Sequence, residues 1–457
     1  MPESTWEPIA ILIIAVTAVF VLIIRLKLNA FIALTLSALL IGLLSSKVPN
    51  EKVVAEVTTR FGSLAGRVGL AIAMAAVIGQ CLMESGAADK ITRRFVAWLG
   101  DKYSSLSLVV SGYVLSVPVF HDTVFYLLVP LARAMSVRMG GARYVLFVTA
   151  IAAGGSVTHC LVPPTPGPLA MAATMNLDLG VVILVGLVVS APASLAAWLY
   201  CIWIDRKMNI PIREAPGLSL DQLSKIASRP ESELPGFWVS MLPIALPVGL
   251  ISANTITETM APGSAALRYT GLLGNPNVAL ILSAAVSVWL LASSKGLSFQ
   301  QLVKPVEQAL LAAGLIILIT SSGGAFGGML VLAGVGDMLG GVADQLGVSL
   351  IVLGFLVATL FKIAQGSGTV AMITSSAILA PLIVANPPPY HAVYVLMACG
   401  SGSMVGMWMN DSGFWVFRTM TGLTEIETLK CKSMALVVLG VTALLTSMLG
   451  AWLVPLK

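Results

Sequence analysis

Titratable and hydroxyl side chains gather in four short segments of a chain that is otherwise largely apolar. These segments, 117–123, 154–168, 362–369 and 400–413, are rich in glycine, proline, serine and threonine. Glycine and proline interrupt regular helices, and an interrupted backbone has unpaired amide and carbonyl groups. Inside a lipid bilayer such groups are tolerated only beside a cavity or within protein. Together with nearby helix N-termini, they are suited to bind a carboxylate or another anion.

Four side chains in these segments could carry a proton: His121, Asp122, His159 and Asp411. Two of the three histidines are among them, and a titratable pair at membrane depth is suited to proton transfer. Plainer interpretations stay open. Asp122 could cap a helix that begins at Thr123, and His121 could be an interfacial histidine. The stretch around Asp411 has the composition of a surface turn, although its place in the chain favours a re-entrant tip.

A second set of side chains could bind a small carboxylate directly. It combines hydroxyl and amide groups, which donate and accept hydrogen bonds, with one cation. Lys362 could neutralise the carboxylate, or it could extend to the membrane interface, since it ends an apolar run. The set is Ser156, Thr158, Thr165, Lys362, Ser367, Thr369, Ser403, Asn410 and Ser412.

The composition defines the class of protein that must position these groups. Of 457 residues, 57% are apolar and 10% are charged, whereas soluble domains have about 25% charged residues. So few charges cannot form a water-facing surface, which excludes a soluble globular or a disordered protein. The apolar runs lack the period-two alternation of membrane barrel strands. The sequence therefore predicts an all-α polytopic membrane protein.

Apolar runs follow one another along most of the chain, and the short ones count as partial spans. We expect roughly 10–12 full crossings. One long polar stretch, 205–236, lies near the middle and is expected to be a cytoplasmic linker. The apolar runs are 8–24, 29–46, 69–83, 104–120, 123–131, 144–161, 179–204, 237–254, 278–294, 309–332, 348–361, 369–385, 392–407 and 434–454.

The regions on either side of the linker share short matches at a nearly constant offset. These matches predict two homologous repeats, 1–204 and 237–457. Among them are 33–38 with 279–284, 123–124 with 369–370, and 155–156 with 402–403.

The basic residues favour opposite orientations for the two repeats. With the N-terminus outside, most basic loops of the first repeat and the linker lie inside, while several equivalent loops of the second repeat carry few bases. Lys47, Lys52 and Arg60 are the exception. Inverted repeats with broken helices and re-entrant hairpins are typical of secondary transporters, which hold the substrate near mid-membrane.

Several other functions are disfavoured. The five cysteines lie singly without CxxC spacing, which argues against a disulfide frame or a zinc site. No GxxxxGK[ST] motif is present for an ATP-driven pump. Ser156 and His159 could form an intramembrane serine hydrolase, but such a pair also needs oxyanion donors and an orienting base. A channel is a further alternative, because Gly-Ser segments can line pores.

The interrupted segments resemble those of the gluconate permease (GntP-type) family of bacterial secondary transporters. The resemblance lies in Val-Thr-His-Cys-Leu-Val-Pro-Pro-Thr-Pro-Gly-Pro at 157–168, Gly-Ser-Gly-Thr-Val-Ala at 366–371 and Asn-Asp-Ser-Gly-Phe-Trp at 410–415, with a further familial stretch at 23–34. The chain departs from the family at three places. Thr165 stands where a histidine is usual. His121-Asp122 replaces a Tyr-Glu pair, and Lys362 replaces an arginine.

The resemblance implies the ion transporter superfamily and symport of a proton with gluconate or a related sugar acid or hydroxycarboxylate. It also implies location in the bacterial inner membrane. A sodium-coupled carboxylate transporter is the alternative within the class. The expected partners are the small carboxylate, the coupling proton and membrane lipid, without nucleic acid. We expect no cofactor, no bound metal and no catalytic residue, and the sequence leaves a homo-oligomer open.

Overall fold

The computed structural model describes residues 6–139, 141–213, 233–261, 263–335, 349–409 and 411–456. Over these ranges the chain is helical and contains no strand, which confirms the predicted all-α class. The helices before the linker are α1 (Trp6–Phe20), α2 (Ala30–Leu44), α3 (Val53–Ser85), α4 (Ala87–Leu99), α5 (Ser104–Leu115), α6 (His121–Arg138), α7 (Tyr144–Leu161), α8 (Pro166–Thr174) and α9 (Leu179–Met208).

The helices that follow the linker include two short ones, α12 and α20. They are α11 (Phe237–Met260), α12 (Leu267–Leu273), α13 (Pro276–Lys295), α14 (Phe299–Leu332), α16 (Leu350–Gln365), α17 (Gly368–Ala385), α18 (Val393–Gly402), α19 (Ser412–Thr421), α20 (Glu425–Thr428) and α21 (Met434–Leu453). Short 3-10 or π-helical turns complete the described chain: η2 (Val21–Arg25), η3 (Asn50–Lys52), η4 (Asp101–Tyr103) and η6 (Leu429–Ser433).

Nine helical stretches of the described ranges are long and apolar enough to cross a membrane, and four apolar helices are shorter. This count is below the roughly 10–12 crossings expected from the apolar runs. The difference arises because several runs end at an interruption. Helices α5, α16 and α18 have 12, 16 and 10 residues, and at about 1.5 Å per residue none spans a hydrocarbon core of about 30 Å.

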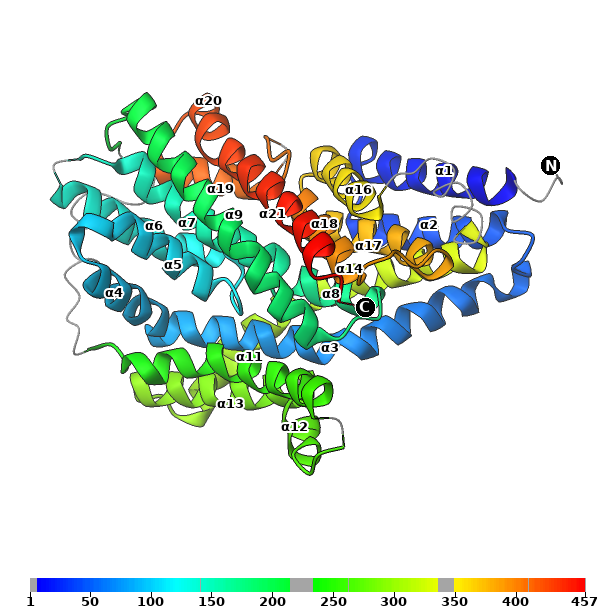
Figure 1. Cartoon of the computed structure of the whole chain (residues 1–457), viewed down its shortest axis with the longest axis horizontal. Helices are drawn as coiled ribbons and strands as arrows, with labels where there is room; N and C mark the ends of the chain where they lie inside the picture. The colour runs from blue at the N-terminus through cyan, green and yellow to red at the C-terminus, as the bar shows by residue number, and fades with distance from the viewer. Residues whose placement is uncertain are drawn as a thin grey trace.

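Helix α3 is longer than the apolar run 69–83 that predicted it, because it begins at Val53 and has 33 residues. Glu56, Arg60 and Arg67 interrupt the apolar run in the sequence. Their spacing of four and seven residues places them on one helical face, so the opposite face still packs against the protein. Helix α3 contacts α13 and α14, which come from the second half of the chain (Figure 1).

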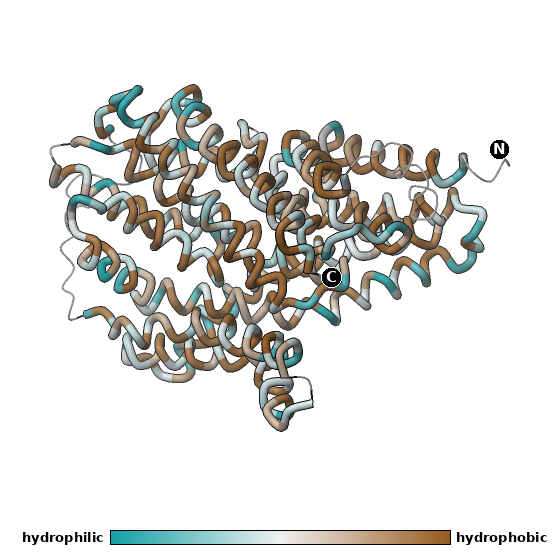
Figure 2. Tube along the Cα trace, viewed as in Figure 1, coloured by the Kyte–Doolittle hydropathy of each residue, from teal (hydrophilic) through white to brown (hydrophobic). Residues whose placement is uncertain are grey.

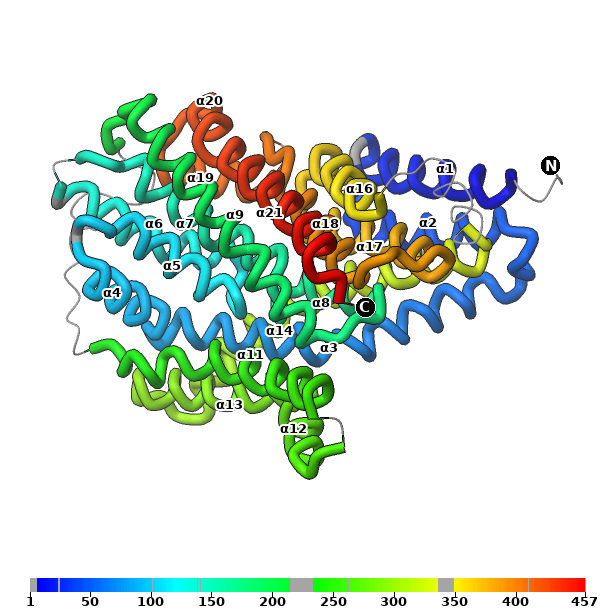
Figure 3. Tube along the Cα trace, viewed as in Figure 1, coloured from blue at the N-terminus to red at the C-terminus, as the bar shows by residue number. Residues whose placement is uncertain are grey.

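Two groups of helices lie toward opposite ends of the long axis of the molecule. Figure 1 shows α4, α5, α6 and α7 toward one end and α1, α2 and α16 toward the other. Segments far apart in the sequence lie side by side between them, such as α9 and α21 in Figure 3. Most of the helices consist largely of hydrophobic residues, as Figure 2 shows.

The core of the protein is formed by α7 and α8. Of the most apolar window in 144–174, 94% is buried, against 22% for the window at the N-terminus. Helix α5 approaches α7 closely at Gly154, where an added Cβ would lie 1.9 Å from the carbonyl oxygen of Val109. Only glycine permits this backbone contact, which is a common way of packing membrane helices. The interruption after α7 is therefore held in the centre of the molecule.

Candidate functional site

The helices are interrupted in all four segments that the sequence singled out. Helix α5 ends at Leu115 and α6 begins at His121, and α7 ends at Leu161 before α8 begins at Pro166. In the second half, α16 gives way to α17 around Gly366, which has a φ of +78°. Glycine adopts this left-handed conformation without steric cost. Helix α18 ends at Gly402, ten residues before α19 begins at Ser412.

The four interruptions converge on one cavity of about 270 Å³, close to the lower end of the range for small-molecule sites. We call it the central cavity. Ile316 of α14 and Leu436 of α21 complete its wall. Its lining residues from the four interruptions are Phe120, His121, Asp122, Ser156, His159, Cys160, Lys362, Gly366, Ser367, Gly368, Thr369, Ser403, Met404, Met407, Asp411, Ser412 and Gly413.

Most of the residues expected to bind a carboxylate or a proton line this cavity, but two lie outside it. The hydroxyl of Thr158 donates to the carbonyl groups of Gly154 and Gly155 within α7. Thr165 precedes α8 and donates to the carbonyl oxygen of Val162 at 2.7 Å. Both hydroxyls already have backbone partners, because each threonine faces protein next to an interruption rather than the cavity. Asn410 lies outside the described residues.

Lys362 and Asp411 form an ion pair in the central cavity, and the side chain of each is only 5% exposed. Lys362 also donates to the carbonyl oxygen of Gly366 at 3.2 Å. Asp411 is the N-cap of α19 and accepts from the amide of Gly413 at 2.6 Å. Their burial overturns two plainer interpretations from the sequence, since Lys362 does not extend to the interface and Asp411 is not in a surface turn.

Asp122 lines the cavity in the first turn of α6 and does not cap that helix. The N-cap is Phe120, and no side chain caps it, so the interpretation of Asp122 as a capping residue is wrong. Among the described residues its carboxylate has no hydrogen-bond or ion-pair partner. A Cβ on Gly413 would lie 3.3 Å from Asp122 Oδ1 and 3.0 Å from Asp411 Oδ1. Both carboxylates thus approach the same position of the fourth interruption.

The two histidines of the cavity lie between α6 and α7. His121 Nε2 and Ser156 Oγ are 3.2 Å apart, whereas the sequence had suggested a pair between Ser156 and His159. His121 is buried, which excludes an interfacial position. The Nδ1 atoms of both histidines are buried without a partner in the described part of the chain. Gly155 makes room for His121, because a Cβ there would lie 2.7 Å from its Nδ1.

One buried cation near the cavity was missed by the sequence analysis. Lys432, on η6, is 1% exposed, and its Nζ donates to the carbonyl oxygen of Gly413 at 2.9 Å. The sequence did not distinguish Lys432 from Lys430, two residues earlier, although Lys430 is exposed in the structure. A lysine just before an apolar run is usually a flanking residue at the interface.

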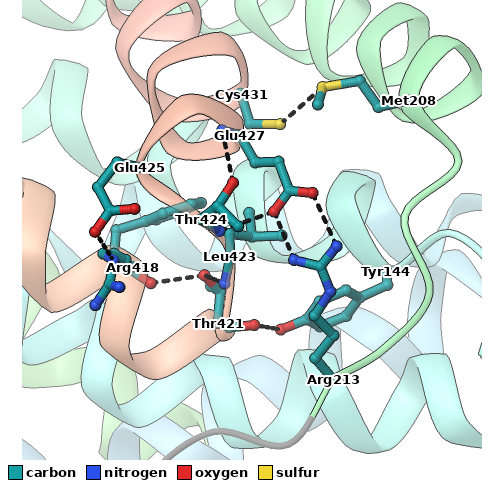
Figure 4. A network of polar contacts seen from close by, with 11 residues as sticks. Tyr144, Met208, Arg213, Arg418, Thr421, Leu423, Thr424, Glu425, Glu427 and Cys431 are labelled. Atoms are coloured by element: carbon teal, nitrogen blue, oxygen red, sulfur yellow. Dashed lines mark hydrogen bonds and ion pairs between the residues drawn. The ribbon is translucent and has the colours of Figure 1, made fainter.

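A polar network joins the ends of α7 and α19–α20 to the segment that follows α9 (Figure 4). Arg213 donates two hydrogen bonds to the Glu427 carboxylate, of 2.6 and 2.9 Å. These bonds raise the pKa of the Arg213 guanidinium above its ordinary value. The hydroxyl of Tyr144 donates to the carbonyl oxygen of Thr421. The network connects segments on both sides of the linker at one end of the long axis.

Comparisons with known proteins agree with this architecture. The model of the GntP family permease matches residues 7–453. The gluconate permease of Pseudomonas aeruginosa is 33% identical over 436 residues, covering 94% of this chain and 95% of that protein. The inner membrane permease YgbN of Escherichia coli is 29% identical over 449 residues, covering 97% and 98%.

A solved structure supports the same fold at low sequence identity. The crystal structure of the Alcanivorax borkumensis YdaH transporter matches 93% of this chain and 98% of its own chain, with a TM-score of 0.61 and 15% identity. The chain therefore belongs to the GntP family of permeases, multi-pass proteins of the bacterial inner membrane, and is a transporter rather than an enzyme.

Proposed function

We propose that this protein is a secondary active transporter that takes up gluconate or a related small sugar acid together with a proton. In this proposal the substrate binds in the central cavity, which opens alternately to the two sides of the membrane. The gluconate permease of Pseudomonas aeruginosa supports the substrate class, since it is similar over almost the whole chain. The size of the cavity, about 270 Å³, suits a small polar molecule.

The proposed architecture consists of two inverted-topology repeats, 1–204 and 237–457, joined by the linker 205–236. Each repeat would hold one re-entrant hairpin, α5–α6 in the first and α16–α17 in the second. The two helices of each pair contact each other, and the pairs lie toward opposite ends of the long axis in Figure 1. Each repeat would also hold one broken spanning helix, α7–α8 or α18–α19. This arrangement is common in secondary transporters.

The chemistry of the cavity suits a hydroxylated carboxylate. Lys362 provides a positive charge, and α17 and α19 begin at the cavity, where the partial positive charge of a helix N-terminus attracts an anion. Hydroxyl groups face the same space and would bind the hydroxyl groups of the substrate. They belong to Ser156, Ser367, Thr369, Ser403 and Ser412.

Proton coupling requires a titratable group that responds to the substrate. In our proposal Asp122 has this role, because its carboxylate lines the cavity and lacks a partner among the described residues. His121, His159 and Asp411 lie around the same space and would assist the transfer. The observation that carries the proposal is the convergence of four helix interruptions on one cavity that holds Lys362 and a carboxylate, Asp122, without a partner among the described residues.

The test uses right-side-out membrane vesicles that contain the protein. They should accumulate labelled gluconate when the outer solution is acidic, and a protonophore should abolish the accumulation. Replacing sodium by potassium in the buffer should leave uptake unchanged; a strict need for sodium would favour a sodium-coupled carrier instead. Vesicles from cells that lack the protein serve as the control for uptake that does not depend on it. Absence of gradient-driven uptake for gluconate and for a panel of related sugar acids would overturn the proposal.

A further inference from the structure

Lys432 is a fully buried cation that does not line the central cavity. It lies on the π-helical turn η6, at the start of a membrane-spanning stretch, and is 1% exposed. A charged side chain at such a place is costly and is usually retained for a function. Single π-helical turns are also frequent at functional sites.

Lys432 has one hydrogen bond and two aromatic rings as neighbours, but no salt bridge among the described residues. Nζ donates to the carbonyl oxygen of Gly413 and lies 5.4 Å from the ring centre of Phe125 and 5.1 Å from that of Phe417. Aromatic faces attract a cation, most strongly where water is excluded. No carboxylate of the described residues lies within ion-pair distance of it. Lys432 and Asp122 both lie next to Gly413, since Lys432 bonds its carbonyl oxygen and a Cβ on Gly413 would lie 3.3 Å from Asp122 Oδ1.

The charges around the cavity balance. Lys362 is paired directly with Asp411, which leaves Asp122 and Lys432 as two opposite charges that interact through space. The other titratable groups facing Asp122 are His121 on α6 and His159 and Cys160 on α7, which are neutral in this balance. With both lysines and both aspartates ionised, the empty cavity carries no net charge.

A monocarboxylate that enters this neutral cavity brings one negative charge. The balance is restored when one group takes up one proton, and Asp122 is the cavity carboxylate that has no direct partner among the described residues. We propose that Lys432 is the positioning residue that fixes the coupling at one proton for each substrate carboxylate, because its positive charge balances the negative charge of Asp122 in the empty carrier. The inference rests on the proposed function of the cavity. Both the empty and the loaded carrier are then neutral, and transport moves no net charge.

Removing the charge of Lys432 changes this balance in a measurable way. Without it, the negative charge of Asp122 has no counterpart, so the empty carrier is neutral only with the Asp122 carboxyl uncharged, and the substrate then enters alone as an anion. The Lys432→Gln variant should therefore take up gluconate without protons, and an inside-negative membrane potential should oppose its uptake. Lys432→Arg should behave like the wild type. Lys430→Gln is the matched control, because Lys430 lies on the same turn and is exposed.

The experiment uses the full-length protein in proteoliposomes with labelled gluconate, an internal pH dye, and potassium with valinomycin to set the potential. The wild type should take up one proton per gluconate independently of the potential. In Lys432→Gln the ratio should fall toward zero. A wild-type ratio near one in this variant, or wild-type transport that carries current, would overturn the inference. If the wild type accumulates no gluconate at all, the proposed function itself fails.

A binding measurement keeps the inference testable if Lys432→Gln does not fold. The Asp122→Asn variant leaves Lys432 uncompensated and should bind gluconate tightly. The double variant Asp122→Asn/Lys432→Gln removes both charges and should bind it about tenfold or more weakly than Asp122→Asn, since a nearby charge in an effective dielectric of about 20 changes affinity by at least this factor. Equal affinities of the two variants, measured by equilibrium binding of labelled gluconate, would contradict the role of Lys432.

Discussion

Lys362 and Asp411 lie 49 positions apart in the sequence and form a buried ion pair between the third and fourth helix interruptions. Asp411 also caps α19 through the amide of Gly413, and Lys362 also holds the carbonyl group of Gly366. The pair therefore joins the end of α16 to the start of α19. In the proposed function, a substrate carboxylate bound to Lys362 would compete with Asp411, and substrate binding would thereby be linked to the position of α19.

Removing one partner of this pair should be more harmful than removing both. Lys362→Gln leaves the Asp411 carboxylate buried and uncompensated, and such changes cost about 3–5 kcal/mol of stability. The double variant Lys362→Gln/Asp411→Asn should be more stable than either single variant but should not transport gluconate. Thermal unfolding of the purified proteins and uptake by vesicles measure the two effects. Unimpaired gluconate uptake by the double variant would contradict a role of the pair in binding.

Replacing Asp122 by asparagine should separate substrate exchange from proton coupling. The amide has nearly the shape of the carboxyl group but cannot carry a proton. Accumulation driven by an acidic outer solution should be lost, while exchange of labelled for unlabelled gluconate continues in part. Glu51→Gln, on the exposed turn η3, serves as the control. An unchanged dependence of uptake on pH would clear Asp122 of this role.

Gly155→Ala should impair transport through the position of His121. The new Cβ would lie 2.7 Å from both His121 Nδ1 and Ser116 Oγ, closer than real contacts allow. Overpacking of this kind costs about 1–3 kcal/mol and would displace the imidazole from Ser156. Gly66→Ala is the matched control, because no atom lies within 4 Å of its added Cβ. Gluconate uptake and the thermal unfolding temperature are measured for both variants. Equal uptake and equal unfolding temperatures for Gly155→Ala and Gly66→Ala would contradict this prediction.

The proposed inversion of the two repeats predicts opposite membrane sides for two exposed turns. Lys102 lies between α4 and α5, and Pro389 lies between α17 and α18; both are exposed. Cysteine at position 102 should react with an impermeant maleimide only from the cytoplasmic side, and cysteine at 389 only from outside. The five native cysteines are buried and should give little background. Reaction of both positions from the same side would rule out inverted repeats.

Much of the central cavity could be predicted from the sequence because its signals are local. Glycine and proline mark the interruptions in any sequence, and an apolar surrounding implies that the freed polar groups face a cavity. This reasoning located His121, Asp122, Lys362 and Asp411, which line the cavity. Short sequence matches at a nearly constant offset also suggested an internal duplication.

The remaining features depend on contacts between distant segments, for which the sequence has no local signal. The partner of Ser156 is His121 on another helix rather than His159 on its own helix. Lys432 faces the rings of Phe125 and Phe417, whereas Lys430 on the same turn is exposed. Residues two positions apart lie on different faces of a helix, and the sequence alone does not show which of the two faces packs against the protein.

The polar network near the ends of α7 and α19 predicts a clear difference between Arg133, which also bonds Tyr144, and Arg213. Arg133 is fully buried and donates to the carbonyl oxygen of Met420 at 3.0 Å and to the hydroxyl of Tyr144 at 3.3 Å. Arg133→Met would leave these groups without their charged donor, at a cost of about 1.5–3 kcal/mol. The Arg213 side chain is 38% exposed, so Arg213→Gln should cost less than about 1 kcal/mol, because solvent screens its ion pair with Glu427. Thermal unfolding in detergent should therefore show a much lower melting temperature for Arg133→Met than for Arg213→Gln. The reverse order would mean that the exposed ion pair, rather than the buried guanidinium, holds this end of the molecule together.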